Sequence, residues 1–307
     1  MSNYTVSFVP DTPNHCWNKA FDLIKDNSTV LDVGCSWGDF GRALKDYKKC
    51  VVDGVEPDKE DARKAKEKLR DVFNGFVEDA FNREFKERSY DHIVFLDVIE
   101  HLYDPVEVFK VVKKHLNPGG SVIFSIPNMA HLSVRLMLLK GDFEYGKTGL
   151  LDSTHLHYYT KKEIDRVFKE AGMLVNIWDY TEATYPEELV KKRLLELGLR
   201  ANKQALDMLM EETARIFQFV GSAVVVSDGD AVERLDYSPN PQGQIMQEFQ
   251  EKLDTYGDEI TRQREALSSK DEIIHGLERK LSDPEYLAKQ IRLSRYVKEY
   301  LKKRLSR

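Results

Sequence analysis

Residues 29–41 (TVLDVGCSWGDFG) constrain the fold of this chain more than any other segment. Val30, Leu31 and Val33 form a short apolar run, as in a strand that is buried on both faces of a parallel sheet. The strand then breaks into Gly34-Cys35-Ser36-Trp37-Gly38, and a helical pattern follows. Glycines there tolerate positive φ and let a ligand approach the backbone. This order predicts a site for a nucleotide-like ligand at the carboxyl end of the strand, although a tight turn without a ligand would share the pattern.

Two carboxylates belong to the same predicted edge of the sheet. Asp32 interrupts the apolar strand. Because a buried carboxylate without partners is costly, we expect Asp32 to accept hydrogen bonds from loop amides or from the ligand. Glu56 ends the next predicted strand, 51–56, and lies 22 positions after Gly34. That spacing suits a carboxylate that binds the two hydroxyls of a ribose, the alternative being a surface glutamate ahead of a turn.

Further strands alternate with amphipathic helical segments along the first 227 residues. Strands are predicted at 75–80 (with the loop that follows), 91–96, 121–126, 174–180 and 217–226, and helices at 12–24, 58–70, 104–116 and 161–171. This alternation predicts an open, mostly parallel α/β sheet. It is interrupted by a long connection, 129–160, and by a helical insertion, 187–216. Long connections within a compact domain tend to be functional.

Composition narrows the function classes. A net charge of −6 gives no general reason to expect a nucleic acid partner. Three cysteines without metal-ligand spacing (Cys16, Cys35, Cys50) argue against a disulfide framework and fit a reducing cytosol. The first residues lack a signal-peptide pattern, and no apolar run approaches the roughly 18 residues of a membrane span. We therefore expect a cytoplasmic protein.

The motifs together resemble one enzyme family. The LDVGCSWG turn, Glu56, Asp79, the block YDHIVFLDVIEHLYDP and the turn LNPGG resemble, in this order, the class I S-adenosylmethionine-dependent methyltransferases. The resemblance covers residues 10–227. It implies a Rossmann-like, seven-stranded, mostly parallel sheet with helices on both faces, whose last strand is antiparallel. It also implies S-adenosylmethionine as cofactor, across the carboxyl ends of the first two strands, and S-adenosylhomocysteine as product.

The resemblance assigns cofactor contacts residue by residue, in addition to the role expected of Asp32. The methionine part would lie along Gly34, Cys35 and Gly38, and the ribose would bind Glu56. The adenine would lie between Asp79 and Ala80, and Asp97 would lie near the sulfonium. Ser36 stands where such turns usually have a second glycine, which weakens a competing nicotinamide-dinucleotide interpretation.

The segments DVIEHLYDP and LLDSTHLHYYT further resemble the ubiquinone-biosynthesis type, closest to the branch found beside or fused to bacterial and archaeal glycosyltransferases. This implies O-methylation of a sugar or glycan hydroxyl, with a lipid-linked polysaccharide as one candidate. Two alternatives stay open. The acceptor can be a free small molecule, such as a quinone precursor or a sugar nucleotide. The chain can also be a coiled-coil assembly protein whose methyltransferase fold is inactive.

Two histidines are candidates for the base that a hydroxyl acceptor requires. His101 follows the fourth strand, and His155 lies in the long connection beside Asp152, which could orient its ring. For His101 the alternative is a residue at a helix start that binds backbone. His157 is expected to point the other way or to lie on the surface. His155 and His157 together with Asp152 suggest a metal site. These residues do not match catechol-type metal ligands, so we expect no metal site.

The last quarter of the chain has a different pattern. Residues 228–244 have the composition of a linker. In 245–282, apolar residues follow alternating steps of three and four, which predicts a coiled coil and a homo-oligomer, or one amphipathic helix packed on the same chain. The tail, 283–307, is amphipathic and carries eight Lys or Arg against three acidic residues. It suits an anionic membrane surface or an acidic partner such as a glycosyltransferase, and a solvated tail is the alternative. With a lipid-linked glycan as acceptor, the protein would lie peripherally at the inner face of the membrane.

Overall fold

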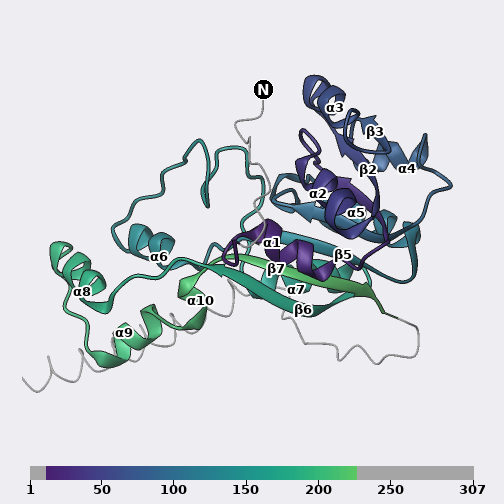
Figure 1. Ribbon diagram of the computed structural model, residues 1–307. Coiled ribbons are helices and arrows are strands. Elements are labelled where there is room, and N and C mark those ends of the chain that lie inside the picture. The colour runs from purple at the N-terminus through teal and green to yellow at the C-terminus, as the bar shows by residue number, and fades with distance from the viewer. Residues whose placement is uncertain (1–11, 227–307) are drawn as a thin grey trace, which may run out of the picture. The chain divides into compact units, whose positions relative to one another are not determined.

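A computed structural model describes residues 12–226 of the chain. They form a seven-stranded sheet with the order β3-β2-β1-β4-β5-β7-β6 (Figure 1). The strands are β1 (Thr29–Val33), β2 (Val51–Glu56), β3 (Asp71–Asn74), β4 (Tyr90–Leu96), β5 (Leu116–Pro127), β6 (Met173–Glu182) and β7 (Ile216–Val225). β7 pairs antiparallel with β5 and β6, and the remaining pairs are parallel. The predicted Rossmann-like sheet is confirmed. The predicted linker 228–244, coiled coil 245–282 and tail 283–307 lie outside the described residues.

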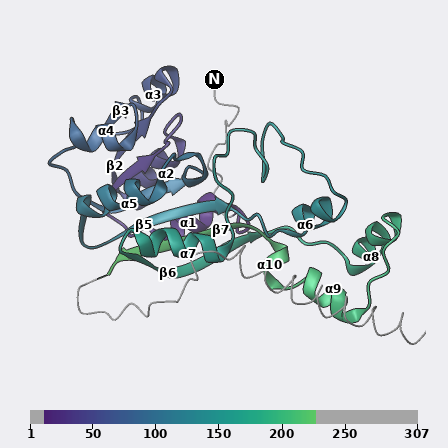
Figure 2. The same cartoon turned by 180° about the vertical axis from the view of Figure 1, so that it is seen from behind.

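Helices cover both faces of the sheet because successive strand residues point to opposite sides. Val30 packs with α1 (Cys16–Leu23), α2 (Asp39–Lys48) and α3 (Lys59–Ala65). Leu31 packs in a second cluster with α4 (Val77–Asn82), α5 (Pro105–Val112) and α7 (Lys161–Glu170). α1 lies in front of the sheet in Figure 1, and α7 lies in front of it in Figure 2. The parallel strands are therefore buried on both sides, as their apolar runs predict.

Several predicted boundaries are wrong. The helix predicted at 58–70 ends at Ala65, and the strand predicted at 121–126 begins at Leu116. The first helix begins at Cys16 and not near Thr12, because His15 caps it by accepting a hydrogen bond from the Trp17 amide. The third strand begins at Asp71 and not at residue 75. The segment before β3 leaves the helical conformation before residue 70, because the Arg70 amide already donates a hydrogen bond to the Val52 carbonyl of β2. Pairing with β2 therefore decides where β3 lies, and the local pattern does not.

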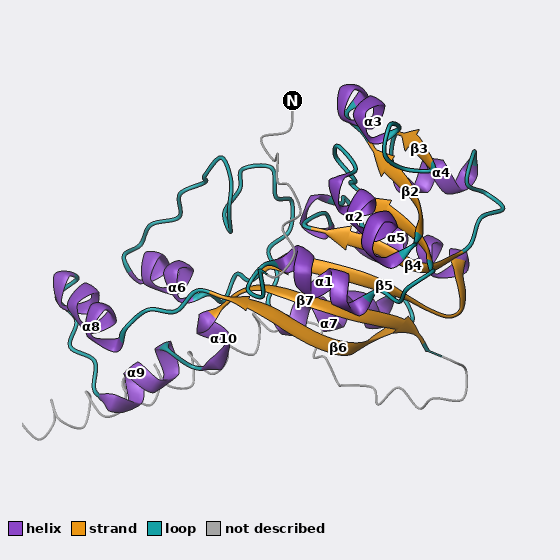
Figure 3. Ribbon diagram, viewed as in Figure 1, coloured by secondary structure: helices purple, strands orange, loops and turns teal. Residues whose placement is uncertain are grey.

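The predicted helical insertion, 187–216, consists of three short helices. These are α8 (Glu187–Glu196), α9 (Lys203–Leu209) and α10 (Glu212–Arg215), and Gly198 has a φ of +74° after the first of them. Buried residues of these helices pack with Leu132 of α6 (Leu132–Leu139) in a separate small cluster. Figure 3 shows α6 and α8–α10 beside the ends of β6 and β7, apart from the helices that cover the sheet.

The parallel strands β1, β2, β4 and β5 end at one edge of the sheet. The segments that follow them are the glycine turn, the loop after Glu56, the short helix η1 (Ile99–His101) and the long connection. Ligands of open α/β sheets bind at this edge. Among the described residues, no helix has the length and apolar character needed to cross a membrane.

Candidate active site

The turn after β1 requires glycine at its first position. Gly34 has a φ of +71° and Gly38 one of +74°. The amides of Gly34 and Cys35 both donate to the Val55 carbonyl, at 2.9 and 3.1 Å, which holds the turn against β2. A Cβ atom on Gly34 would lie 2.6 Å from Cγ2 of Val98. Any larger residue would therefore both strain the backbone and displace the segment after β4.

Glu56 lies beside this turn, as predicted. Its Oε2 accepts a hydrogen bond from the Ser36 amide at 2.8 Å, and its Oε1 accepts one from the Asp58 amide at 2.9 Å. Burial raises the pKa of the carboxyl group, although the two amides oppose this. The carboxylate is thus positioned by backbone donors at the end of β2. Its contact with a ribose stays a prediction.

Asp32 is buried in the middle of the same edge. Its carboxylate interacts with the Gly41 amide, but the Oδ2 atom has no hydrogen-bond partner. Burial, reinforced by the negative charge of Glu56, raises the pKa of Asp32 to about 7. A positively charged ligand group beside Oδ2 would favour the ionised carboxylate. The amide that binds Asp32 therefore belongs to the first turn of α2 and not to the loop, and one oxygen is left for a ligand.

The residues predicted to contact the adenine do not lie where the sequence placed them. Asp79 and Ala80 belong to α4 and not to a loop after a strand. Ala80 is fully buried in the core, and Asp79 is exposed. Gly75 follows β3, and the next residue, Phe76, is 63% exposed. It was missed because β3 was misplaced, although the Asn74-Gly75 pair is a turn signal that marks the true end of the strand.

The Cys35 side chain also points away from the turn. A Cβ atom on Gly54 would lie 2.6 Å from its Sγ, and Cys35 belongs to the buried cluster below α2 and α3. Burial raises the pKa of this thiol well above its usual value, and the charges of Asp32 and Glu56 add to the effect. Only the backbone of Cys35 is therefore available to a ligand at the turn.

Asp97 ends β4 in a strained conformation. Its φ is +55°, which non-glycine residues rarely adopt and which often marks functional sites. Its Oδ1 accepts hydrogen bonds from the Ser125 hydroxyl at 2.9 Å and from Gln218 Nε2 at 2.8 Å. Burial raises the pKa of Asp97. The carboxylate is held by β5 and β7 next to the glycine turn, and Gln218 is a supporting residue that the sequence did not reveal.

Directly after Asp97, Glu100 and two histidines form a cluster. Glu100 is 1% exposed, and neither of its carboxylate oxygens has a hydrogen-bond partner. His155 Nε2 lies 3.9 Å from Glu100 Oε1, and the rings of His101 and His155 are 4.9 Å apart. One ligand atom from each of the three residues lies within 4.8 Å of the others. Burial raises the pKa of Glu100 well above its usual value, and the charges of Asp97 and Asp152 add to this.

The hydrogen bonds of the two rings define their tautomers. His101 Nδ1 lies 3.1 Å from the Thr154 carbonyl, which can only accept, so Nδ1 carries the proton and Nε2 keeps a lone pair. The His155 ring is likewise bonded to the Leu150 carbonyl. Burial lowers the pKa of His155, and the neighbouring His101 adds to the effect. His155 is therefore neutral near pH 7 and can accept a proton or bind a metal.

Asp152 lies near His155 but does not face Nε2. Its Oδ1 accepts hydrogen bonds from the amide and hydroxyl of Thr154, at 2.8 and 2.7 Å. Its charge raises the pKa of His155 only as a secondary effect. The carboxylate opposite Nε2 is that of Glu100, a residue that sequence analysis missed. His157 points elsewhere, to the Tyr103 carbonyl at 3.2 Å.

Comparison with known proteins identifies the family. The sequence profile of a family described as "Methyltransferase domain" matches residues 9–175, more than half of the chain. The chain belongs to this methyltransferase family. It is a class I methyltransferase, and S-adenosylmethionine is its cofactor.

Individual relatives are distant. A ubiquinone biosynthesis O-methyltransferase of Hydrogenovibrio crunogenus is 26% identical over 160 residues, which cover 51% of this chain and 66% of that protein. A phosphoethanolamine N-methyltransferase 2 of Caenorhabditis elegans is 29% identical over 35% of this chain and 26% of its own length. The chain thus spans less than two thirds of either relative. A solved structure of a Thermotoga maritima methyltransferase, described as a possible histamine N-methyltransferase, superposes with a TM-score of 0.46 at 19% identity, over 67% of this chain and 86% of that one.

The residues at this edge fit S-adenosylmethionine. The cofactor carries an ammonium and a sulfonium group, and the edge presents the buried carboxylate of Asp32 and the half-buried carboxylate of Asp97. The orphan Oδ2 of Asp32 is a ready partner for the ammonium. At Gly34 a Cβ atom would collide with Val98, so the backbone there is open only because the residue is glycine. Asp32, Gly34, Glu56 and Asp97 would therefore hold the cofactor.

Proposed function

We propose that this methyltransferase methylates a hydroxyl group of a sugar or glycan, such as a lipid-linked polysaccharide. The observation that supports O-methylation is the cluster of buried Glu100, half-buried His155 and exposed His101, next to Asp97 at the cofactor edge. A hydroxyl must lose a proton when it is methylated, and this cluster supplies both a neutral imidazole and a carboxylate. The choice of a glycan rests on the resemblance of the segments around these residues.

The protein has two tasks in this reaction. S-adenosylmethionine supplies an already activated methyl group, so the chain must align the acceptor and remove its proton. His155 Nε2 can take that proton while the acceptor oxygen forms its bond to the methyl carbon. Glu100, 3.9 Å away, would stabilise the imidazolium that results. S-adenosylhomocysteine and the methyl ether are then the products.

The same cluster offers a second way to activate a hydroxyl. A carboxylate and two imidazoles with available lone pairs are suitable ligands for a divalent cation, and such a cation would lower the pKa of the acceptor hydroxyl. The rings of both histidines are hydrogen-bonded to backbone carbonyls, as those of metal ligands often are. The unpartnered oxygens of Glu100 favour this alternative to the metal-free site that the sequence predicts.

Transfer of a labelled methyl group to a panel of acceptors tests the function. The panel contains methyl hexosides, a dihydroxybenzoate and a sugar nucleotide. We expect label in the hexosides, and label only in the dihydroxybenzoate would instead support a quinone precursor, the acceptor class that the name of the Hydrogenovibrio relative suggests. No label in any of them, together with no cofactor binding, would support the inactive assembly protein.

His155→Ala tests the proposed chemistry. It should lower kcat by about 10²- to 10⁴-fold and leave cofactor affinity, measured by calorimetry, unchanged. The matched control is His115→Ala, whose ring stacks on Phe81 and binds the Arg88 carbonyl on another part of the sheet. Loss of activity with a chelator and recovery with Mn²⁺ would assign the cluster to a cation. Activity that a chelator does not change would assign proton removal to His155 alone, and full turnover in the variant would exclude His155 from both roles.

The C-terminal segments extend this proposal to partners and location. We propose that 245–282 forms a homo-oligomer and that 283–307 binds an anionic membrane surface or a glycosyltransferase at the inner face of the membrane. The alternating apolar pattern and the eight basic residues of the tail support this. Deletion of 245–307 should lower the mass in light scattering and abolish sedimentation with anionic vesicles. An unchanged mass would refute the coiled coil.

A further inference from the structure

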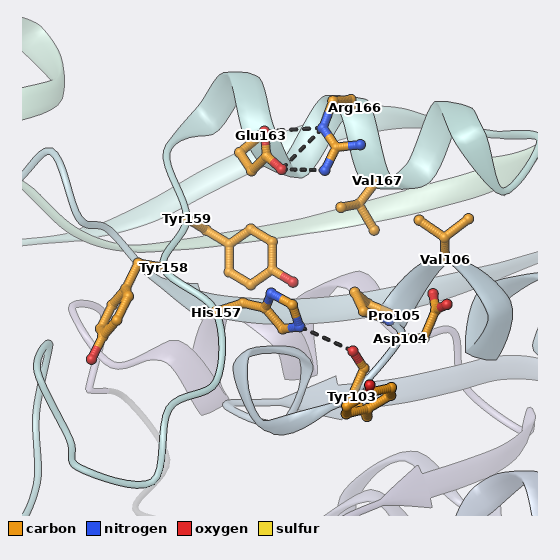
Figure 4. Close-up of a pocket in the computed structure, with 10 residues that line it drawn as sticks. All are labelled: Tyr103, Asp104, Pro105, Val106, His157, Tyr158, Tyr159, Glu163, Arg166 and Val167. Carbon is orange, nitrogen blue, oxygen red and sulfur yellow. Dashed lines mark hydrogen bonds and ion pairs between the residues drawn. The ribbon is translucent and has the colours of Figure 1, made fainter. Parts of the chain in front are cut away.

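A second cavity adjoins the Glu100 cluster. It has a volume of about 260 Å³ and lies between the start of α5, the segment 157–159 and α7 (Figure 4). His157, Tyr158 and Tyr159 line it, and they also line the small pocket that contains Glu100 and His155. The cavity is therefore separated from the proposed reacting groups by a single stretch of chain.

The Tyr159 hydroxyl is unpaired and points into this cavity. Tyr159 is only 3% exposed, and its hydroxyl has no hydrogen-bond partner. Figure 4 shows the ring in the middle of the cavity, with the hydroxyl directed toward the space beside Pro105. Burial raises the pKa of Tyr159, and the charges of Glu100 and Glu163 on either side add to this. The hydroxyl thus stays protonated, and it is a buried donor that a ligand could satisfy.

The other polar groups of the lining select for a neutral ligand. Asp104 and Glu163 contribute carboxylates, which accept hydrogen bonds from hydroxyl groups. Arg166 is the cationic side chain of the lining, but Glu163 and Glu170 bind its guanidinium group. A phosphate or carboxylate would therefore meet no uncompensated positive charge. At the rim, Tyr103 is 91% exposed and offers an aromatic face.

We propose that this cavity is a subsite for a neutral sugar ring of the acceptor, next to the ring whose hydroxyl is methylated. Several hydroxyl groups on one small ring match one buried donor and two carboxylates in a cavity of this size. The proposal rests on the proposed function and makes it more specific. It implies that the acceptor is an oligosaccharide or polysaccharide and not a sugar nucleotide, whose phosphates the acidic lining would repel.

The experiment compares one-ring and two-ring acceptors. Binding of methyl dihexosides to the full chain is measured by saturation-transfer NMR, independently of turnover, for the wild type and for Tyr159→Phe, Tyr103→Ala and the control Tyr47→Phe. Tyr47 is 62% exposed on α2, which covers another part of the sheet. The kcat/KM ratio of dihexoside to hexoside is then measured for each protein. Thermal melting shows that each variant is folded.

We expect the wild type to prefer a dihexoside. Loss of one neutral hydrogen bond should reduce that preference about 5-fold in Tyr159→Phe. Tyr103→Ala should reduce it as well, and Tyr47→Phe should not. A dihexoside that does not bind, or binds equally to the wild type and to both variants, would overturn the subsite. A dihexoside that binds through Tyr159 without being methylated would leave the subsite standing and refute the proposed function. A preference for the sugar nucleotide would also overturn the proposal.

Discussion

Carboxylates at the two ends of the sheet differ in their hydrogen-bond partners. At the amino ends of the strands, Asp91 accepts hydrogen bonds from the amide and hydroxyl of Thr29 and from Asn117. Asp53, fully buried in β2, is bound by Arg70, Arg88 and Tyr90. At the carboxyl ends, Asp32 and Glu100 are equally buried, yet oxygens of both lack partners.

This difference also appears in the ionisation of the groups. Burial alone would raise the pKa of Asp53, but hydrogen bonds from Arg70, Arg88 and Tyr90 outweigh it and lower the pKa. At Asp32 the Gly41 amide does not outweigh burial and the charge of Glu56, and the pKa rises to about 7. At the amino end, ion pairs and hydrogen bonds therefore stabilise the buried carboxylate. At the carboxyl end, Asp32 and Glu100 have unpartnered oxygens that a ligand could bind. We therefore expect substitutions at the amino end to lower stability, and substitutions at the carboxyl end to lower cofactor binding or methyl transfer.

The largest effect is expected for Gly34→Ala at the carboxyl end. The added Cβ atom would lie 2.6 Å from Val98 in a backbone with φ +71°. We expect affinity for S-adenosylmethionine, measured by calorimetry, to fall at least about 100-fold, since a displaced turn loses most of its contacts at once. The matched control is Gly119→Ala at the amino end, with φ +77° and nothing within 4 Å of the new atom. It should cost only about 1 kcal/mol of stability, and weaker cofactor binding in it would contradict the comparison.

The cofactor side of the site could be predicted from sequence because it is local. The apolar run of β1, the glycine turn and Glu56 at the end of β2 are encoded in contiguous residues with a fixed spacing. The turn then forms wherever such a strand is buried between neighbours. The open, mostly parallel sheet followed from the alternation of strands and helices, and its seven strands with an antiparallel last strand followed from the family resemblance.

The rest depends on contacts between distant segments. β3 is placed by its register with β2, which sequence periodicity does not contain. Glu100 looks like part of a helix start in the sequence, and it is buried because the amides of Leu156 and His157 bind its carbonyl and fold the long connection over it. The positions of Glu100 and Phe76 therefore became visible only when segments far apart in the chain were brought together.

Asp53→Asn should be the most destabilising of the carboxylate substitutions. Breaking a buried ion pair usually costs 3–5 kcal/mol, and because Arg70 and Arg88 are partly exposed we expect about 2–4 kcal/mol. The pKa of Asp53 is lowered by folding, so its contribution is present above the ordinary pKa of 3.8 and is lost as the pH falls through the folded value. Urea denaturation at pH 8 and at pH 3 measures this. Cofactor affinity should not change, and a loss of affinity would show that the two ends are coupled.

Glu100→Gln should stabilise the protein, whereas Asp53→Asn should destabilise it. The pKa of Glu100 is raised by folding, so the wild type loses stability as the pH rises above the ordinary value of 4.5. Removing this unpaired charge should stabilise the protein by about 1–3 kcal/mol at pH 8, and the gain should vanish below pH 4.5. Methyl transfer should fall while the melting temperature rises. If the variant melts below the wild type at pH 8, Glu100 has a partner that stabilises its charge.

The smallest expected effect tests whether Phe76 or Asp79 contacts the adenine. Stacking of a base on an aromatic ring is typically worth about 1–3 kcal/mol. Because Phe76 is 63% exposed, the lower end applies, and Phe76→Ala should raise the Kd for S-adenosylmethionine by roughly 5-fold. Asp79→Ala, on the exposed side of α4, should leave the Kd unchanged. The opposite result would restore the contact expected from sequence and would require α4 to rearrange when the cofactor binds, whereas the β3 register would remain as the structure has it.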